Sequence, residues 1–523
     1  MNKSILLLII IMSFYSANAQ ILKPESYYHY IDSFNINDED LTQNYITNSN
    51  CQDFIFANIP LLDCSDKDIE LTYYFRWWTY RKHIKQTPDG FVITEFLPDV
   101  PWAGKYNTIS CPAAMHFYEG RWLRNRQFLD DYARFWFNGG DIRLYSCWIA
   151  DALYNQYLVT GDNTLIEELL PDLIDNYKAW EKDHLSDNGL FWQVDDRDGM
   201  EVSVCGSGYR TTINSYMYGD SKAISAIAKI AGHQNIANEY SSKAINLKLN
   251  VEKKLWDEKM DFFKVLPRDS NAVLCTAREL HGYTPWYFNM PEAEYSVAWK
   301  FLTDSAHFFA PFGPTTVERC NPDFKISYTG HECQWNGPTW PYATSITLTA
   351  LANLLNNYSQ KEIKKEDYCE LLKIYSKSQR RKKEDGRIIP WIDENLNPFS
   401  GDWVSRTRLK AWNNGTWSKD KGGKERGKDY NHSTYCDLVI TGLIGLRPQE
   451  GDTLVINPLI SCDYFCLDNV LYHGYNITIL YDKTGKQYNK GKGFYIYIDG
   501  EEVAKSTSLK RLVINIKKSL ASR

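Results

Sequence analysis

Apolar residues recur with a helical period through most of this chain. Ala237, Tyr240, Ala244, Leu247, Val251 and Leu255 follow one another at spacings of three and four, which predicts an amphipathic helix of about five turns. A helix from about Ile69, and one that carries Tyr145, Trp148 and Leu153 on one face, follow from the same pattern. Further helices are predicted over residues 171–182, 215–231, 292–303, 342–357, 366–380 and 434–445.

Loops rich in Gly, Asp, Asn and Trp join these helices, which indicates paired helical hairpins with aromatic inner faces. No sequence motif recurs at a period of 20 to 50 residues, so the pattern favours a closed toroid over a solenoid. After residue 447 the pattern becomes that of strands, with β-rich runs over residues 453–456, 477–481, 494–498 and 512–516 and a hairpin signal at Asp499-Gly500.

We therefore predict a mainly α fold: a toroid of helical hairpins over residues 71–447 and a small C-terminal antiparallel β domain over residues 448–523. Residues 20–70 are polar and rich in Asn and Asp, and we interpret them as an N-terminal wrap and not as an independent domain.

The first nineteen residues have the features of a signal peptide. Lys3 supplies a positive charge, residues 5–12 are apolar but too short to span a bilayer, and Ala17-Asn18-Ala19 is a small-residue cleavage pattern. We expect an exported protein, periplasmic or secreted, that begins at Gln20 and has no membrane association after cleavage.

Composition then narrows the function. The net charge of -6 is small for 523 residues, and it does not favour nucleic-acid binding. The 17 Trp and 36 Tyr residues favour glycan ligands, because an aromatic ring matches the mixed apolar and polar surface of a sugar.

We predict neither a metal nor a cofactor. The twelve cysteines are scattered, and we assign no disulfide. His331 and Cys333 alone do not make a zinc site, and the segment around Asp198 lacks the acidic residues that a calcium loop needs at its first and twelfth positions.

Residues 335–341, Trp-Asn-Gly-Pro-Thr-Trp-Pro, place two indoles five residues apart across a Gly-Pro turn at a helix start. Two acidic segments flank this aromatic loop along the chain, residues 195–201 after Trp192 and residues 393–401 after Trp391. One acid, one base and aromatic rings are what cleavage of a glycosidic bond requires. Any single Trp is equally well explained as a core residue.

These segments resemble, in order, the motifs of the six-hairpin (α/α)6-barrel glycosidases, in particular glycoside hydrolase family 63 and the bacterial mannosylglycerate hydrolases. Gly199 to Ser203 matches Gly-x-Asp-x-Ser with Glu in place of Asp, Trp335 to Trp340 matches Trp-x-Gly-Pro-x-Trp, and Glu394 to Gly401 matches Glu-Asn-x-x-Pro-x-x-Gly. The resemblance implies an (α/α)6 barrel, Glu201 as general acid, Glu394 as general base and inversion by a single displacement.

Asp198 is an alternative general acid, three residues before Glu201. Glu201 lies between Met200 and Val202, and apolar surroundings raise the pKa of a carboxyl group, as a proton donor requires. The remaining candidates are substrate-binding residues: Arg76, Trp77, Arg81, Trp102, Arg210, Trp335, Asn336, Trp340, Trp391, Tyr430 and His432. Each Arg is equally compatible with a structural ion pair, and His432 with a helix cap.

We therefore expect an exported glycoside hydrolase that removes an α-linked sugar from the end of an oligosaccharide or glycoside. Pro98, Pro101 and Trp102 lie in a stiff stretch over residues 96–124 that is predicted to close one end of the pocket. Three alternatives stay open: an α-L-rhamnosidase on the same barrel, a non-catalytic glycan-binding protein, and a polysaccharide lyase that uses Tyr430 and His432.

Overall fold

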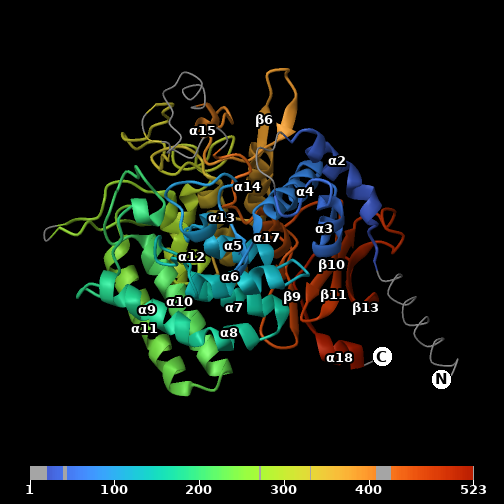
Figure 1. Ribbon diagram of the computed structural model, residues 1–523, viewed down its shortest axis with the longest axis horizontal. Helices are drawn as coiled ribbons and strands as arrows, with labels where there is room; N and C mark the ends of the chain where they lie inside the picture. The colour runs from blue at the N-terminus through green and yellow to red at the C-terminus, as the bar shows by residue number, and fades with distance from the viewer. Residues whose placement is uncertain are drawn as a thin grey trace.

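The computed structural model describes residues 20–38, 44–269, 272–329, 331, 333–407 and 426–521 (Figure 1). The predicted signal peptide lies outside the described residues, as does the whole stretch over residues 408–425. Within the described part, no helix combines the length and the apolar character needed to cross a membrane.

Helices are the main regular element of the molecule. They are α2 (Tyr28–Ile36), α3 (Cys51–Asn58), α4 (Lys67–Lys82), α5 (Ala113–Gly120), α6 (Gln127–Phe137), α7 (Ile149–Thr160), α8 (Thr164–Glu168), α9 (Leu170–His184), α10 (Thr211–Ile230), α11 (Gln234–Leu255), α12 (Thr284–Tyr287), α13 (Pro341–Asn357), α14 (Lys365–Ser378), α15 (Val404–Thr407), α17 (Tyr435–Asp437) and α18 (Ile516–Ala521). A π-helical segment, η8 (Leu438–Leu443), continues α17.

Six of these segments close into a ring. α5 packs on α7, α7 on α10, α10 on α12, α12 on α13, α13 on η8, and α17 returns to α5. Others, such as α11, α9 and α14, pack against the outside of this ring, as an (α/α)6 toroid requires. The predicted fold class is therefore confirmed.

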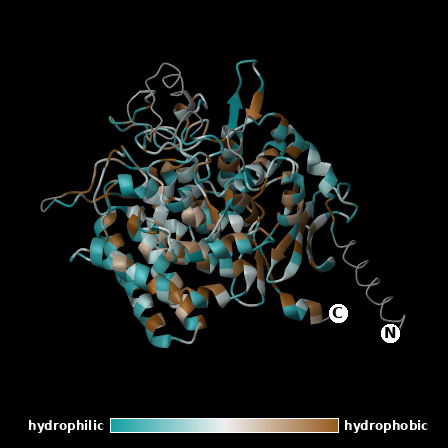
Figure 2. Ribbon diagram, viewed as in Figure 1, coloured by the Kyte–Doolittle hydropathy of each residue, from teal (hydrophilic) through white to brown (hydrophobic). Residues whose placement is uncertain are grey.

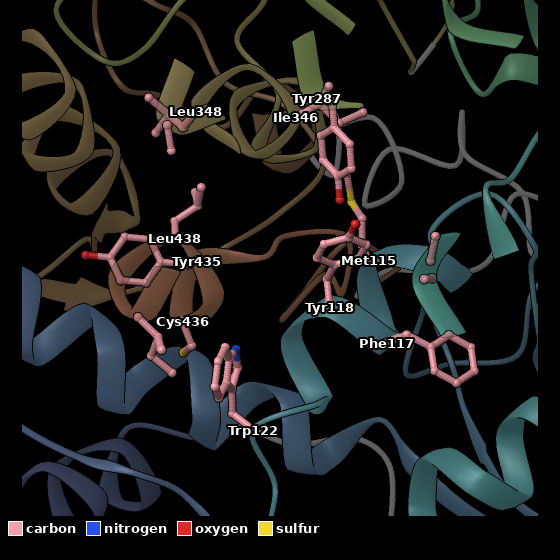
Figure 3. Packing of buried hydrophobic residues seen from close by; sticks show 14 of the residues in the cluster. Met115, Phe117, Tyr118, Trp122, Tyr287, Ile346, Leu348, Tyr435, Cys436 and Leu438 are labelled. Carbon is pink, nitrogen blue, oxygen red and sulfur yellow. The ribbon is translucent and has the colours of Figure 1, made fainter. Parts of the chain in front are cut away.

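Buried side chains pack into the centre of the ring. Figure 3 shows Met115, Tyr118 and Trp122, from α5 and the turn after it, facing Tyr435 and Leu438. All five are less than one tenth exposed. In the outer layer, α11 carries hydrophobic and hydrophilic residues at the helical spacing that the sequence predicts (Figure 2).

Several predicted helices differ from the observed ones. The segment over residues 292–303 is a 3-10 helix, Ala293–Phe301, and the one over residues 434–445 is mainly π-helical. The helix expected to include Tyr145 begins only at Ile149, because Trp148 has non-helical dihedral angles (φ -105°, ψ 61°). The predictions for α9, α10, α11, α13 and α14 are confirmed to within four residues at each end.

The C-terminal strands form an antiparallel sheet in the order β1-β10-β11-β12-β13. These strands are β1 (Leu61–Cys64), β10 (Tyr464–Tyr472), β11 (Tyr475–Asp482), β12 (Gly493–Ile498) and β13 (Glu501–Ser506). Asp499 and Gly500 both have positive φ in the turn between β12 and β13, which confirms the predicted hairpin. A second sheet has the order β14-β9-β8, with β14 (Leu512–Asn515), β9 (Thr453–Ile456) and β8 (Leu446–Arg447).

Strand β1 comes from the N-terminal stretch and pairs with β10, Leu62 opposite Leu467. The side chain of Asp468 also accepts hydrogen bonds from the backbone N–H groups of Ile21 and Leu22, both at 2.7 Å. Residues 20–70 therefore complete the C-terminal sheet in the structure. The division of the chain into domains stays a prediction.

Candidate active site

A cavity of about 430 Å³ opens where the ring helices begin. Its walls come from the loops that precede the N-terminal ends of α5, α7, α10, α13 and α17, so residues far apart in sequence converge there. The lining residues are Glu95, Phe96, Trp102, Ile109, Cys111, Tyr145, Asp196, Arg197, Gly199, Glu201, His331, Cys333, Trp335, Trp340, Tyr342, Glu394, Arg426, Tyr430 and His432.

The two indoles of the aromatic loop form one surface of this cavity. The rings of Trp335 and Trp340 are stacked, with centroids 4.7 Å apart and an interplanar angle of 16°. The Trp340 indole N–H donates to the carbonyl of Gln334 at 2.7 Å, and Pro341 begins α13 at a position where a missing N–H costs nothing. The faces of the rings are thereby fixed before any ligand binds.

The aromatic loop is hydrogen-bonded to both carboxylate loops. The backbone N–H of Trp335 donates to the carbonyl of Glu201 at 3.2 Å, and Thr339 and Leu396 exchange two backbone hydrogen bonds of 3.0 Å. The three sequence motifs therefore form one backbone network.

Glu201 faces the cavity, and burial raises the pKa of its carboxyl group to about 8, with smaller contributions from Asp196 and Glu394. The residue after it, Val202, has φ of 62°, a left-handed conformation that a β-branched residue rarely adopts.

A disulfide between Cys205 and Cys275 links the loop that contains Glu201 to the segment beyond α11. The scattered cysteine pattern gave no reason to predict that bond.

Glu394 is 1% exposed and pairs with Arg426, whose Nη2 lies 2.9 Å from Glu394 Oε2. A guanidinium at this distance stabilises a carboxylate. Arg426 was not among the predicted site residues. It lies four residues before Tyr430, and no sequence motif around it indicates a role in the site.

A third carboxyl group, Glu95, also lines the cavity and was not predicted. It is 5% exposed, accepts a hydrogen bond from the Tyr430 hydroxyl, and lies with Oε1 3.8 Å from Nδ1 of His432. Burial, together with the charges of Glu394 and Glu201, raises the pKa of Glu95 to about 8. Burial also keeps the pKa of His432 well below its usual range.

Seven predicted site residues line this cavity: Trp102, Glu201, Trp335, Trp340, Glu394, Tyr430 and His432. The structure places Asp198, the alternative acid, outside it. The Asp198 side chain is fully buried and pairs with Arg210, Nε to Oδ2 at 2.6 Å, so both residues brace the acid loop from behind. In the charged run before Glu201, Asp196 and Arg197 are exposed, whereas Asp198 is buried.

Five other candidates also lie away from the cavity wall. Arg81 donates to the carbonyl of Ile46 and to Asn48, Trp77 packs on Tyr73 and Tyr80, and Arg381 stacks on Trp391. Asn336 faces a neighbouring hollow, and Arg76 is completely buried. Helical periodicity alone did not show which face of α4 turns inward.

The sequence motifs lead to the expectation that the aromatic loop lines the largest cavity together with Glu201 and Glu394, but in the described part of the chain this cavity is not the largest. A second cavity has about 480 Å³. Both carboxylates and both indoles share the 430 Å³ cavity as predicted.

Comparison with known proteins matches residues 105–433, more than half of the chain, to the mannosylglycerate hydrolase MGH1-like glycoside hydrolase domain. The chain belongs to this family of glycoside hydrolase domains. Membership of this family supports a glycosidase over the two alternatives of a non-catalytic glycan-binding protein and a polysaccharide lyase.

Three solved structures extend the comparison. A sialidase is 42% identical, with a TM-score of 0.87 over 94% of this chain, and the present chain spans 44% of its length. The mannosylglycerate hydrolase of Thermus thermophilus, in complex with Tris and D-glycerate, is 10% identical with a TM-score of 0.50, covering 71% of this chain and 100% of that one. The GH78 rhamnosidase of Bacillus sp. GL1 is 12% identical with a TM-score of 0.53, covering 81% of this chain and 40% of that one. The last two show the shared fold alone.

Proposed function

We propose that the protein is an exported, inverting glycoside hydrolase that releases an α-linked sugar from the non-reducing end of an oligosaccharide or glycoside. The observation that carries this proposal is the meeting of Glu201, Glu394 and the stacked pair Trp335 and Trp340 on one cavity. A sugar ring lies on the indoles, and its scissile bond lies between the two carboxyl groups.

Glu201 is the general acid. With a pKa of about 8, its carboxyl group is mostly protonated at neutral pH, and it gives that proton to the glycosidic oxygen as the bond to the anomeric carbon breaks. The departing group leaves as a neutral alcohol, and Glu201 becomes a carboxylate.

Glu394 is the general base. Its ion pair with Arg426 favours its carboxylate form, and it takes one proton from a water molecule whose oxygen attacks the anomeric carbon from the opposite face. One water is consumed, no bond forms between sugar and protein, and the anomeric configuration inverts. Proton exchange with solvent then restores both groups.

Action at a chain end is proposed because the stretch over residues 96–111 contributes a wall. Phe96, Trp102 and Ile109 line the cavity, and the rings of Phe96 and Trp102 meet edge to face with centroids 5.9 Å apart. A wall on this side admits a terminal sugar and blocks a continuing chain.

A panel of aryl glycosides and reduced oligosaccharides tests the proposal, with proton NMR of the first product formed. We expect release of terminal sugar with the β-anomer appearing first from an α-linked substrate. A rapid fall in the viscosity of a long polymer, or retention of configuration, would contradict end-cleavage or inversion respectively.

A second candidate is release of a terminal acidic sugar, favoured by the 42% identity to a protein named as a sialidase. Arg197 lines the cavity beside Asp196 and stacks on Tyr145, so it is placed to meet a carboxylate. The same panel, extended by α-sialosides and α-L-rhamnosides, distinguishes these sugars. Export is tested by the N-terminal sequence of the protein recovered from its host, expected to begin at Gln20.

A further inference from the structure

The second cavity, of about 480 Å³, lies at the opposite end of the ring from the catalytic carboxylates. Its walls come from the later turns of α7, α10 and α13, the end of α12 and the segment that follows η8. The reaction proposed above uses none of its residues, so the cavity needs a separate explanation.

Positive charge dominates this cavity. Arg121 and Asp437 neutralise each other there, with Nη2 and Oδ1 2.8 Å apart. Lys222, Arg447 and Arg511 also line it, and within the described residues none of these three forms an ion pair with a carboxylate. Such a concentration of cations is notable in a chain with a net charge of -6.

The remaining lining carboxyl group does not offset these cations fully. Asp151 accepts a hydrogen bond from the Tyr118 hydroxyl at 2.6 Å, and burial raises the pKa of Asp151 to about 6. At slightly acidic pH this group loses its charge, and the cavity becomes more positive. Arg447 is held in place by a hydrogen bond to the side chain of Asn353.

The cavity also contains an unused hydrogen-bonding group. The Tyr287 side chain is 5% exposed, and its hydroxyl makes no well-aligned hydrogen bond within the described residues, although its ring meets Trp148 edge to face. Tyr287 and Tyr118 lie next to each other in Figure 3, with ring centroids 5.5 Å apart. A buried hydroxyl without a partner is costly, so a ligand that supplies one is favoured.

We propose that this cavity is a second binding site, for a small anionic ligand of sugar size: a polyol that carries a carboxylate or a phosphate. Its volume is close to the 430 Å³ of the catalytic cavity, which fits one sugar ring. Lys222, Arg447 and Arg511 bind the anionic group, and Tyr287 with the asparagine side chains at the end of α13 binds hydroxyls.

Isothermal titration calorimetry of the full chain tests the site with D-glucuronate, glucose 6-phosphate, inorganic phosphate and uncharged glucose. We expect the two anionic sugars to bind, glucose to bind much more weakly, and the comparison with inorganic phosphate to show what the polyol part adds. The variant Lys222→Gln/Arg511→Gln should weaken binding of both anionic sugars at least about tenfold, the scale of a lost charge-assisted hydrogen bond.

A matched control is available on the same segments. Lys229→Gln/Lys510→Gln removes the same total charge from α10 and from the residue beside Arg511, but neither side chain lines the cavity. This control should bind like the wild type, and both double variants should retain glycosidase activity. The variant Glu394→Gln shows whether the anionic sugars bind in the catalytic cavity and not in the second one.

Equal binding of the anionic sugars to Lys222→Gln/Arg511→Gln and to the wild type would overturn the proposal. So would absence of binding, or binding lost only in Glu394→Gln.

Discussion

The backbone N–H of Trp335 donates to the backbone carbonyl of Glu201 at 3.2 Å, so the aromatic loop sets the position of the acid loop directly. On its other side the same loop exchanges two hydrogen bonds with Leu396, two residues after Glu394. Glu201 and Glu394 are thereby positioned relative to each other through one turn and not through side-chain contacts alone.

Glu201→Gln should lower turnover at least about a hundredfold on substrates with poor leaving groups, because they need a proton on the departing oxygen. Aryl glycosides with activated leaving groups should lose much less. Glu394→Gln should abolish activity on both kinds of substrate. Steady-state kinetics on a series of leaving groups measures the difference.

Asp198→Asn is the comparison for Glu201→Gln. The buried ion pair with Arg210 leads us to expect a lower melting temperature and no dependence on the leaving group. If Asp198→Asn shows that dependence and Glu201→Gln does not, the assignments of the two residues must be exchanged.

Arg426→Gln should lower turnover on all substrates, activated ones included, because Glu394 loses the guanidinium that stabilises its charged form. The acidic limb of the pH profile should also move to higher pH. Arg197→Gln is the matched control for the pH profile only: Arg197 lines the same cavity but pairs with Asp196 instead, so its acidic limb should stay at the wild-type pH. An unchanged acidic limb in Arg426→Gln would show that this ion pair does not set the charge of Glu394.

The alkaline limb of the pH profile of turnover should reflect the ionisation of Glu201. Its pKa is raised to about 8, so turnover of substrates with poor leaving groups should fall as the pH rises through about 8 and the proton is lost. Activated aryl glycosides should keep their activity there. The pH profile of Glu95→Gln is needed too, because Glu95 also titrates near 8. If turnover of Glu201→Gln still falls near pH 8, the ionisation of another group causes that fall.

The amphipathic helices were predictable because burial on one face leaves a period in the sequence, as in α11. The strand β1 was not, because its partner β10 lies about 400 residues later and no local pattern encodes such a pairing. The 3-10 segment Ala293–Phe301 was missed because its apolar spacing resembles that of a helix.

For the site, Glu201, Glu394 and the two indoles were predictable because contiguous motifs carry them. Glu95 and Arg426 were not, since each reaches the cavity from a separate loop and only the closed ring brings them together. Sequence also did not show that Arg76 and Arg81 of α4 lie away from the cavity wall, because a buried arginine and a cavity-lining one look alike in sequence.

Replacing both Cys205 and Cys275 by Ser should destabilise the protein by about 2–4 kcal/mol, because the bond spans a sequence separation of 70 and restricts the unfolded chain. Turnover should fall as well, since Cys205 lies in the acid loop. Cys320→Ser, at an exposed free cysteine, should change neither. Mass spectrometry after alkylation without reductant checks the bond, and full alkylation of Cys205 in the native protein would disprove it.

The contribution of Glu95 to the stability of the protein should decrease as the pH rises from about 4.5 to about 8. The pKa of Glu95 is raised from 4.5 to about 8 in the folded protein. Within this window the folded state keeps a proton that the unfolded chain has released. The free energy of unfolding therefore decreases with rising pH, by at most about 1.4 kcal/mol per pH unit for one group.

Glu95→Gln isolates that contribution. Glutamine resembles the protonated acid and keeps a carbonyl oxygen for the Tyr430 hydroxyl, so the variant should fold and should lose its share of the pH dependence. Urea unfolding of both proteins at pH 5, 6, 7 and 8 gives the two slopes. Glu366→Gln, on the exposed face of α14, should keep the wild-type slope. Equal slopes in Glu95→Gln and wild type would mean that Glu95 is already ionised in the folded protein.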